Sequence, residues 1–73
     1  MLKADGFDKA IIGVGMRCGQ TDVLIYDVDE CIDILVQRDK MSYNEAMEYM
    51  EFNVLGSWVG EETPIFMRPY EEE

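Results

Sequence analysis

The sequence predicts an α+β domain in which a small antiparallel sheet packs against a helical hairpin, in the order β-β-α-α-β. Residues 10–18 alternate apolar side chains with others, which is the period of a half-buried strand. Residues 27–56 repeat apolar side chains at helical spacing in two stretches. A short apolar run at 63–67 is typical of one more strand. We expect the 73 residues, 1–73, to form a single domain.

The first two strands are expected to form a β-hairpin. A helical spacing also fits part of 10–18, but Gly13, Gly15 and the β-branched residues beside them favour a strand. The glycine and polar residues at 18–22 indicate a turn. The apolar run at 23–26 then indicates the returning strand of the hairpin.

The first helix of the expected helical hairpin begins at Asp27, whose side chain is placed to cap it. The charged residues at 38–40 end it. Cys31 lies on its inward face, where a thiol behaves as a small hydrophobic side chain, and Cys18 lies near the turn between the strands. We expect both thiols to be free, as is usual in a reducing compartment. The inward stripe consists of Val28, Cys31, Ile32, Leu35 and Val36.

The second helix follows a turn at Met41 and Ser42. Ser42 and Glu45 have the spacing of a capping box, in which each side chain accepts a hydrogen bond from the backbone N–H of the other residue. Gly56 is a natural stop for this helix. Its inward stripe consists of Tyr43, Ala46, Met47, Met50 and Val54.

The remaining chain is expected to form a loop, a short strand and a tail. The loop carries the single tryptophan, Trp58. The strand at 63–67 has its proline near the start, where no ladder N–H is needed. Residues 1–6 and 68–73 are expected to be loose ends.

The chain carries a net charge of −10, which is unevenly distributed. Residues 1–26 are neutral, residues 27–56 carry −6 and residues 57–73 carry −4. Such a surface repels phosphates, so we expect no direct binding to nucleic acid. Two interpretations of the charge stay open. It serves solubility and attraction to a basic partner, or it mimics nucleic acid and occupies a DNA-binding host protein. The acids of the second helix are Glu45, Glu48 and Glu51.

No arrangement of residues indicates catalysis. The chain has no histidine, which removes the usual base beside a nucleophile. Two cysteines are too few for a structural zinc site, and no aspartate-rich calcium loop is present. We therefore expect a non-enzymatic protein without cofactor or metal. The sequence has no signal-peptide core and no apolar run long enough for a bilayer, so we expect a cytoplasmic protein without membrane contact.

The glycines near the first turn suggest a candidate ligand site. Their spacing, G-x-G-x-x-x-G, differs from the dinucleotide fingerprint, and a turn follows where that motif has a helix. Glycines on one face of a strand also let another backbone approach closely. A small-ligand site stays an alternative, with four candidate residues: Gly13, Gly15, Arg17 and Gln20.

The second helix carries more apolar side chains than one buried face needs. Six methionines add side chains that adapt to varied surfaces. A domain this small also buries a modest share of its surface, which favours support from self-association. We therefore expect a protein-binding module that forms a homo-oligomer, most simply a dimer. The interface candidates are Tyr49, Phe52, Leu55 and Trp58.

Short runs at 12–14, 17–19, 26–27, 41–46, 52–56, 60–61 and 63–66 carry a further signal, and the most specific is Phe-Asn-x-x-Gly, Gly-Glu and Thr-Pro-x-Phe in succession. Together they resemble a group of small proteins from tailed bacteriophage and environmental viral genomes. The resemblance extends over residues 7–67. That group has no established activity, so the resemblance implies a setting only. It implies an accessory protein that acts on a host or viral protein in the cytoplasm of a host cell.

Overall fold

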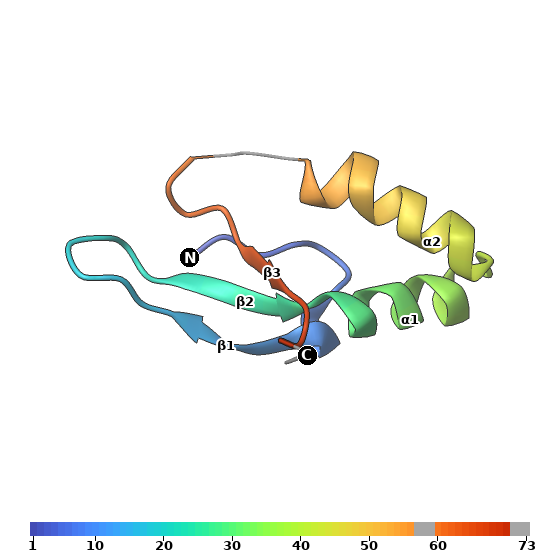
Figure 1. The fold of residues 1–73 in the computed structure, drawn as a ribbon, viewed down its shortest axis with the longest axis horizontal. Helices are drawn as coiled ribbons and strands as arrows, with labels where there is room; N and C mark the ends of the chain where they lie inside the picture. Colours follow the sequence, from blue (N-terminus) through green and yellow to red (C-terminus); the bar gives the residue numbers. More distant parts are fainter. Residues whose placement is uncertain (57–59, 71–73) are drawn as a thin grey trace.

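The computed structural model describes residues 1–56 and 60–70 and confirms a small α+β domain (Figure 1). A three-stranded sheet lies at one end, and the helix pair extends from the end of the middle strand. The elements are η1 (Asp8–Ala10, a 3-10 helix), β1 (Ile11–Gly15), β2 (Val23–Asp27), α1 (Val28–Arg38), α2 (Tyr43–Tyr49), η2 (Met50–Leu55, a π-helix) and β3 (Ile65–Met67).

The sheet has the strand order β1-β2-β3 and is mixed, which corrects the expectation of an antiparallel sheet. β1 and β2 pair antiparallel as the predicted hairpin, whereas β3 pairs parallel to β2. The helix pair explains the difference. α2 and η2 run back toward the sheet, and residues 60–64 lie near the start of β2, so β3 runs in the same direction as β2 (Figure 1).

β1 confirms the predicted strand over a shorter range than 10–18, because η1 precedes it. A β-bulge between Ile11 and Gly13 interrupts its pairing with β2. The apolar side of β1 is less buried than its alternation suggests, since Ile12 is 52% and Val14 is 45% exposed. Val14 lies opposite the buried Leu24, so at this point the core reaches β2 but not β1, whereas Ile11 at the start of β1 still packs against it.

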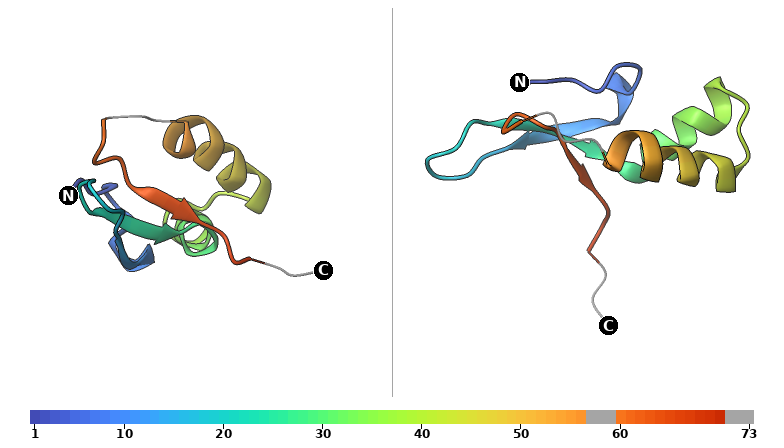
Figure 2. Two further views of the ribbon diagram at one scale, coloured as in Figure 1. Left: turned by 60° about the vertical axis from the view of Figure 1, so that its left-hand side comes forward. Right: turned by 90° about the horizontal axis from the view of Figure 1, so that it is seen from above.

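The core lies on one face of the sheet, where the N-terminal segment crosses the strands (Figure 2). Tyr26 is fully buried there, and its hydroxyl accepts a hydrogen bond from the Ala4 N–H at 2.8 Å. The Tyr26 ring stacks on Phe66 with 5.3 Å between centroids, so Tyr26 links the N-terminal segment, β2 and β3. The buried core residues are Phe7, Ala10, Leu24, Tyr26, Val28, Cys31, Ile32, Leu35, Ala46 and Met50.

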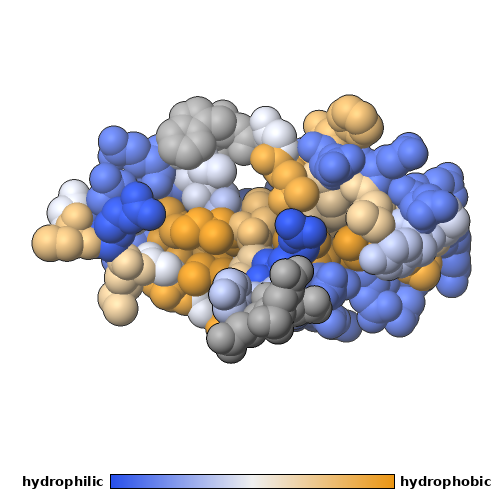
Figure 3. Space-filling model, in the orientation of Figure 1, coloured by the Kyte–Doolittle hydropathy of each residue, from blue (hydrophilic) through white to orange (hydrophobic). Residues whose placement is uncertain are grey.

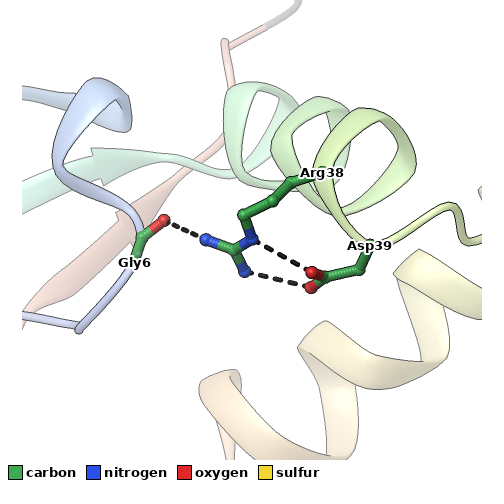
Figure 4. Close-up of polar contacts among 3 residues, drawn as sticks. All are labelled: Gly6, Arg38 and Asp39. Atoms are coloured by element: carbon green, nitrogen blue, oxygen red, sulfur yellow. Dashed lines mark hydrogen bonds and ion pairs between the residues drawn. The ribbon is translucent and has the colours of Figure 1, made fainter.

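Residues 1–6, expected as a loose lead-in, are held against the end of α1 by Arg38 (Figure 4). The guanidinium donates to the Gly6 carbonyl oxygen at 2.7 Å and to both oxygens of Asp39 at 3.1 and 3.0 Å. It also lies 5.6 Å from the centroid of the Phe7 ring, in a cation–π arrangement. The hydrogen bonds from Arg38 hold the pKa of Asp39 below its usual range. This cluster fixes the segment that covers the core face of the sheet.

Both helices begin at the predicted caps. The Asp27 carboxylate accepts a hydrogen bond from the Asp29 N–H at 3.0 Å. Ser42 and Glu45 form the predicted capping box, with 3.2 Å from Glu45 N to Ser42 Oγ and 3.0 Å from Ser42 N to Glu45 Oε1. Each cap satisfies N–H groups that the first turn of a helix leaves unpaired.

The capping box predicts a specific dependence of stability on pH. Hydrogen bonds from the Ser42 backbone N–H and hydroxyl lower the pKa of Glu45. A carboxyl group whose pKa is lowered in the folded protein adds stability above its unfolded pKa, about 4.3, and this contribution is lost as the pH falls through the folded value. Glutamine still accepts from the Ser42 N–H but does not titrate. We therefore expect Glu45→Gln to be less stable than the native chain near neutral pH, with the difference vanishing in acid.

Urea denaturation of both proteins at a series of pH values measures this difference. Comparing the two chains at each pH cancels the effect of the other carboxyl groups, which titrate in both. A difference that stays constant from neutral to acid pH would contradict the prediction.

The two cysteines are free, as expected. Cys18 is exposed, and Cys31 is buried on α1. Burial, together with the nearby carboxylates of Asp27 and Glu30, raises the pKa of Cys31 to about 11. Because the thiolate is the reactive form, Cys31 contributes packing rather than chemistry.

Candidate protein-binding surface

The second helix changes from α to π at Met50, and this change shapes its surface. Ala46, Met50 and Val54 are spaced four apart, which exceeds the ~3.6 residues of an α-helical turn. The wider π turn takes up the extra length, so Met50 stays buried and Val54 stays packed against the core. Phe52 points away from the core and is 79% exposed.

Two shallow hollows lie on either side of a ridge formed by Tyr49 and Asn53. Each of these two residues lines the first hollow as well as the second. The first hollow, of about 320 Å³, includes Phe52. The second, of about 440 Å³, lies between the helix, the N-terminal segment and the start of β3. The apolar residues lining the second hollow include Leu2, Phe7, Val54, Pro64 and Phe66.

We name these two hollows and the ridge between them the Phe52 surface. Glu45 and Glu48 border its first hollow, and Lys3 and Asp5 border its second. An apolar centre with a charged rim is the usual arrangement of a protein–protein interface. The surface therefore has the chemistry to hold an apolar side chain of a partner.

Three of the four interface residues predicted from the sequence lie in the described chain. Tyr49 and Phe52 lie together on the Phe52 surface, where Tyr49 is 38% exposed. Leu55, at the end of η2, is also partly exposed but lines neither hollow. Trp58 lies outside the described residues.

Sequence reasoning alone does not find the far wall of the second hollow. That wall consists of the N-terminal segment and the residues that lead into β3. Leu2 stands in the stretch 1–6 that is expected to be loose, and Phe7 directly follows it; their apolar character is the available signal. Only the folded chain places them opposite Tyr49, because Arg38 and the core hold that segment in position.

The four candidate ligand residues do not gather around the Phe52 surface. Gly13 and Gly15 share one face of β1, whereas Arg17 and Gln20 lie in the exposed hairpin turn. The Gln20 N–H donates to the Arg17 carbonyl oxygen at 3.0 Å, and Gly19 has a φ of +75°, as in a type II turn. The backbone closes a turn at this place rather than forming a cradle for an anion.

The acids of the two helices line separate hollows. Glu45 and Glu48 border Phe52. The acids of α1 and of its cap gather beside Tyr43 instead, in a hollow lined by Asp27, Asp29, Glu30 and Asp33. A partner bound at the Phe52 surface thus contacts a small part of the negative charge.

No helix within the described residues is long and apolar enough to cross a membrane. Comparison of this chain with models of protein families, with curated proteins and with solved structures found no match.

Proposed function

We propose that this chain is a small, acidic, non-enzymatic module that binds another protein through the Phe52 surface. The observation that carries the proposal is the exposure of Phe52 beside Tyr49, next to two hollows. An aromatic ring in water has a large apolar area, and a partner's pocket would remove that area from water. Such anchors supply most of the binding energy at many interfaces.

The proposed partner is a protein segment with an apolar anchor flanked by basic residues. Glu45 and Glu48 border the first hollow, and the chain carries −10 overall, so long-range attraction favours a basic segment. A second copy of this chain suits the same surface less well, because two copies would bring these acids together. The resemblance to small phage proteins supports a host or viral protein as the partner, in the cytoplasm of an infected cell.

Capture from a bacterial lysate tests the proposal with three immobilised proteins. These are the native chain, Phe52→Ser and the control Ile12→Ser, which removes an exposed apolar residue from the sheet. We expect the native chain and the control to retain the same protein. We expect Phe52→Ser to bind it about 30-fold more weakly, which corresponds to about 2 kcal/mol for a central anchor. Equal retention by all three proteins would overturn the proposal.

A variant in which the three acids of the second helix are neutralised separates this function from nucleic-acid mimicry. Replacing Glu45, Glu48 and Glu51 by glutamine is expected to change the affinity for the captured protein by a small factor, because each exposed ion pair contributes about 0–1 kcal/mol. A mimic depends on its acids, so the same variant would lose binding, and binding by the native chain would fall steeply with salt. Affinities of both proteins at low and at physiological salt decide between the two functions.

A further inference from the structure

The sheet has a second face, opposite the N-terminal segment, and no helix of the described chain lies across it (Figures 1 and 2). Directly opposed strand residues share a face. Gly13 is paired with Ile25, Ile25 with Ile65, and Gly15 with Val23. We name this set the open face, and its residues are Gly13, Gly15, Val23, Ile25 and Ile65.

The open face is apolar and shallow. Ile65 is 48% exposed, Ile25 is half-buried, and Val23 is buried at 7% exposure, so Ile65 and Ile25 supply the exposed apolar side chains. The ends of the Ile25 and Ile65 side chains lie over Gly15, where a methyl group would stand 3.3 and 3.5 Å from their Cδ1 atoms. A methyl group at Gly13 would meet no heavy atom of the described residues within 4 Å, so the backbone lies open there. Figure 3, which looks onto this side of the sheet, shows apolar atoms gathered across the strands.

The chain exposes more surface than a compact monomer of its mass. Its accessible area is 5626 Å², against about 4,600 Å² expected for 8.4 kDa. Its radius of gyration is 12.8 Å, against about 11 Å expected for 73 residues. The excess, about 1,000 Å², is comparable to the ~800 Å² that each partner buries in a stable interface.

We infer that the open face is the contact between two copies of this chain, packed sheet against sheet about a two-fold axis. Residues near such an axis meet their own copies, so a charged patch would repel itself. The five residues of the open face carry no charge, and residues 1–26, which supply four of them, are neutral in a chain of −10. The acidic helices extend beyond the end of the sheet and stay apart (Figure 1). Gly13, where the backbone lies open, lets the second sheet approach closely.

This inference goes beyond the proposed function and does not rest on it, because it places the second copy on the sheet and leaves the Phe52 surface free. Light scattering at micromolar concentration tests it with a matched pair of variants. Ile65→Lys and Val14→Lys both place a lysine at an apolar position of similar exposure, 48% and 45%, and Val14 pairs with Leu24 of the core face, opposite the open face. We expect a mass of twice 8.4 kDa for the native chain and for Val14→Lys, and 8.4 kDa for Ile65→Lys.

Circular dichroism shows whether either lysine variant is misfolded. If one is, Gly13→Val provides a second test of the dimer contact. Valine fits the open space at Gly13 and favours a strand, so it leaves the protomer folded but holds two sheets apart. We expect it to weaken the dimer at least about tenfold, or by about 1.4 kcal/mol. A native mass of 8.4 kDa, or dissociation by Val14→Lys but not by Ile65→Lys, would overturn the inference. Dissociation of the dimer by Phe52→Ser would also overturn the inference. Capture of the lysate partner by Ile65→Lys reports on the proposed function separately.

Discussion

Replacing Leu35 by alanine is expected to remove a large part of the stability of this domain. Leu35 is completely buried in the core that α1 forms with Ala46 and Met50 of the second helix. Losing its side chain leaves a cavity and costs about 2–5 kcal/mol. A domain of 73 residues is expected to have about 4–11 kcal/mol in total. We therefore expect Leu35→Ala to lose about half of its free energy of unfolding.

Urea denaturation at one fixed protein concentration measures this loss, because association makes stability depend on concentration. Ile12→Ala is the control, since it shortens an apolar side chain that is about half exposed. We expect that variant to stay within about 0.5–1 kcal/mol of the native chain. Equal losses for the two variants would show that Leu35 does not lie in a packed core.

Tyr26→Ala is expected to be at least as destabilising as Leu35→Ala. The Tyr26 ring is fully buried, stacks on Phe66 of β3, and carries the hydroxyl that accepts from the Ala4 N–H. Truncating a large buried aromatic residue costs about 3–5 kcal/mol. Because this ring also links β2 to β3 and to the N-terminal segment, we expect loss of the cooperative unfolding transition near physiological temperature.

Tyr26→Phe separates the hydroxyl from the ring. It keeps the stacking on Phe66 but leaves the Ala4 N–H without its acceptor, at a cost of about 0.5–1.5 kcal/mol. We expect amide exchange in residues 1–6 to accelerate in this variant while exchange in α2 stays nearly unchanged. Uniform acceleration through the chain would contradict this local role of the hydroxyl.

Local signals predicted where the helices begin, but not every inward side chain of the second helix, since Tyr43 and Met47 are 60% and 43% exposed. Asp27, Ser42 and Glu45 each act within a few residues of their own position, and their hydrogen bonds form as their spacing indicates.

The alternation in 10–18 likewise predicted a strand correctly. The same alternation did not predict which side chains of β1 are buried. Val14 is exposed because the core does not extend past Leu24 of β2 at this point, and the sequence of β1 alone does not contain that information.

Features that depend on distant parts of the chain did not follow from the sequence. The parallel pairing of β3 depends on where the helix pair returns the chain. The π-helix depends on the fit of Met50 and Val54 to a core built by other elements. The docking of the N-terminal segment depends on Arg38, which sequence reasoning uses only as the end of a helix.

The candidate surface was predicted in part. The surplus of apolar residues on the second helix identified Tyr49 and Phe52, since one buried face does not need them. The hollow on the far side of Tyr49 needed the folded N-terminal segment. The glycines of β1 indicate a place where another backbone can approach. The pairing of Gly13 with Ile25, and of Ile25 with Ile65, shows which face of the sheet carries them.

The central claim is that Phe52 contacts another protein, and photo-crosslinking from position 52 tests it most directly. A photoreactive phenylalanine analogue replaces Phe52 in one chain and Ile12 in a control chain, and both are expressed and irradiated in bacterial cells. Both positions are exposed, so both analogues are accessible to a partner. We predict one dominant adduct with a different protein from position 52 and none of that mass from position 12. The same adducts from both positions, or no adduct from position 52, would contradict the claim.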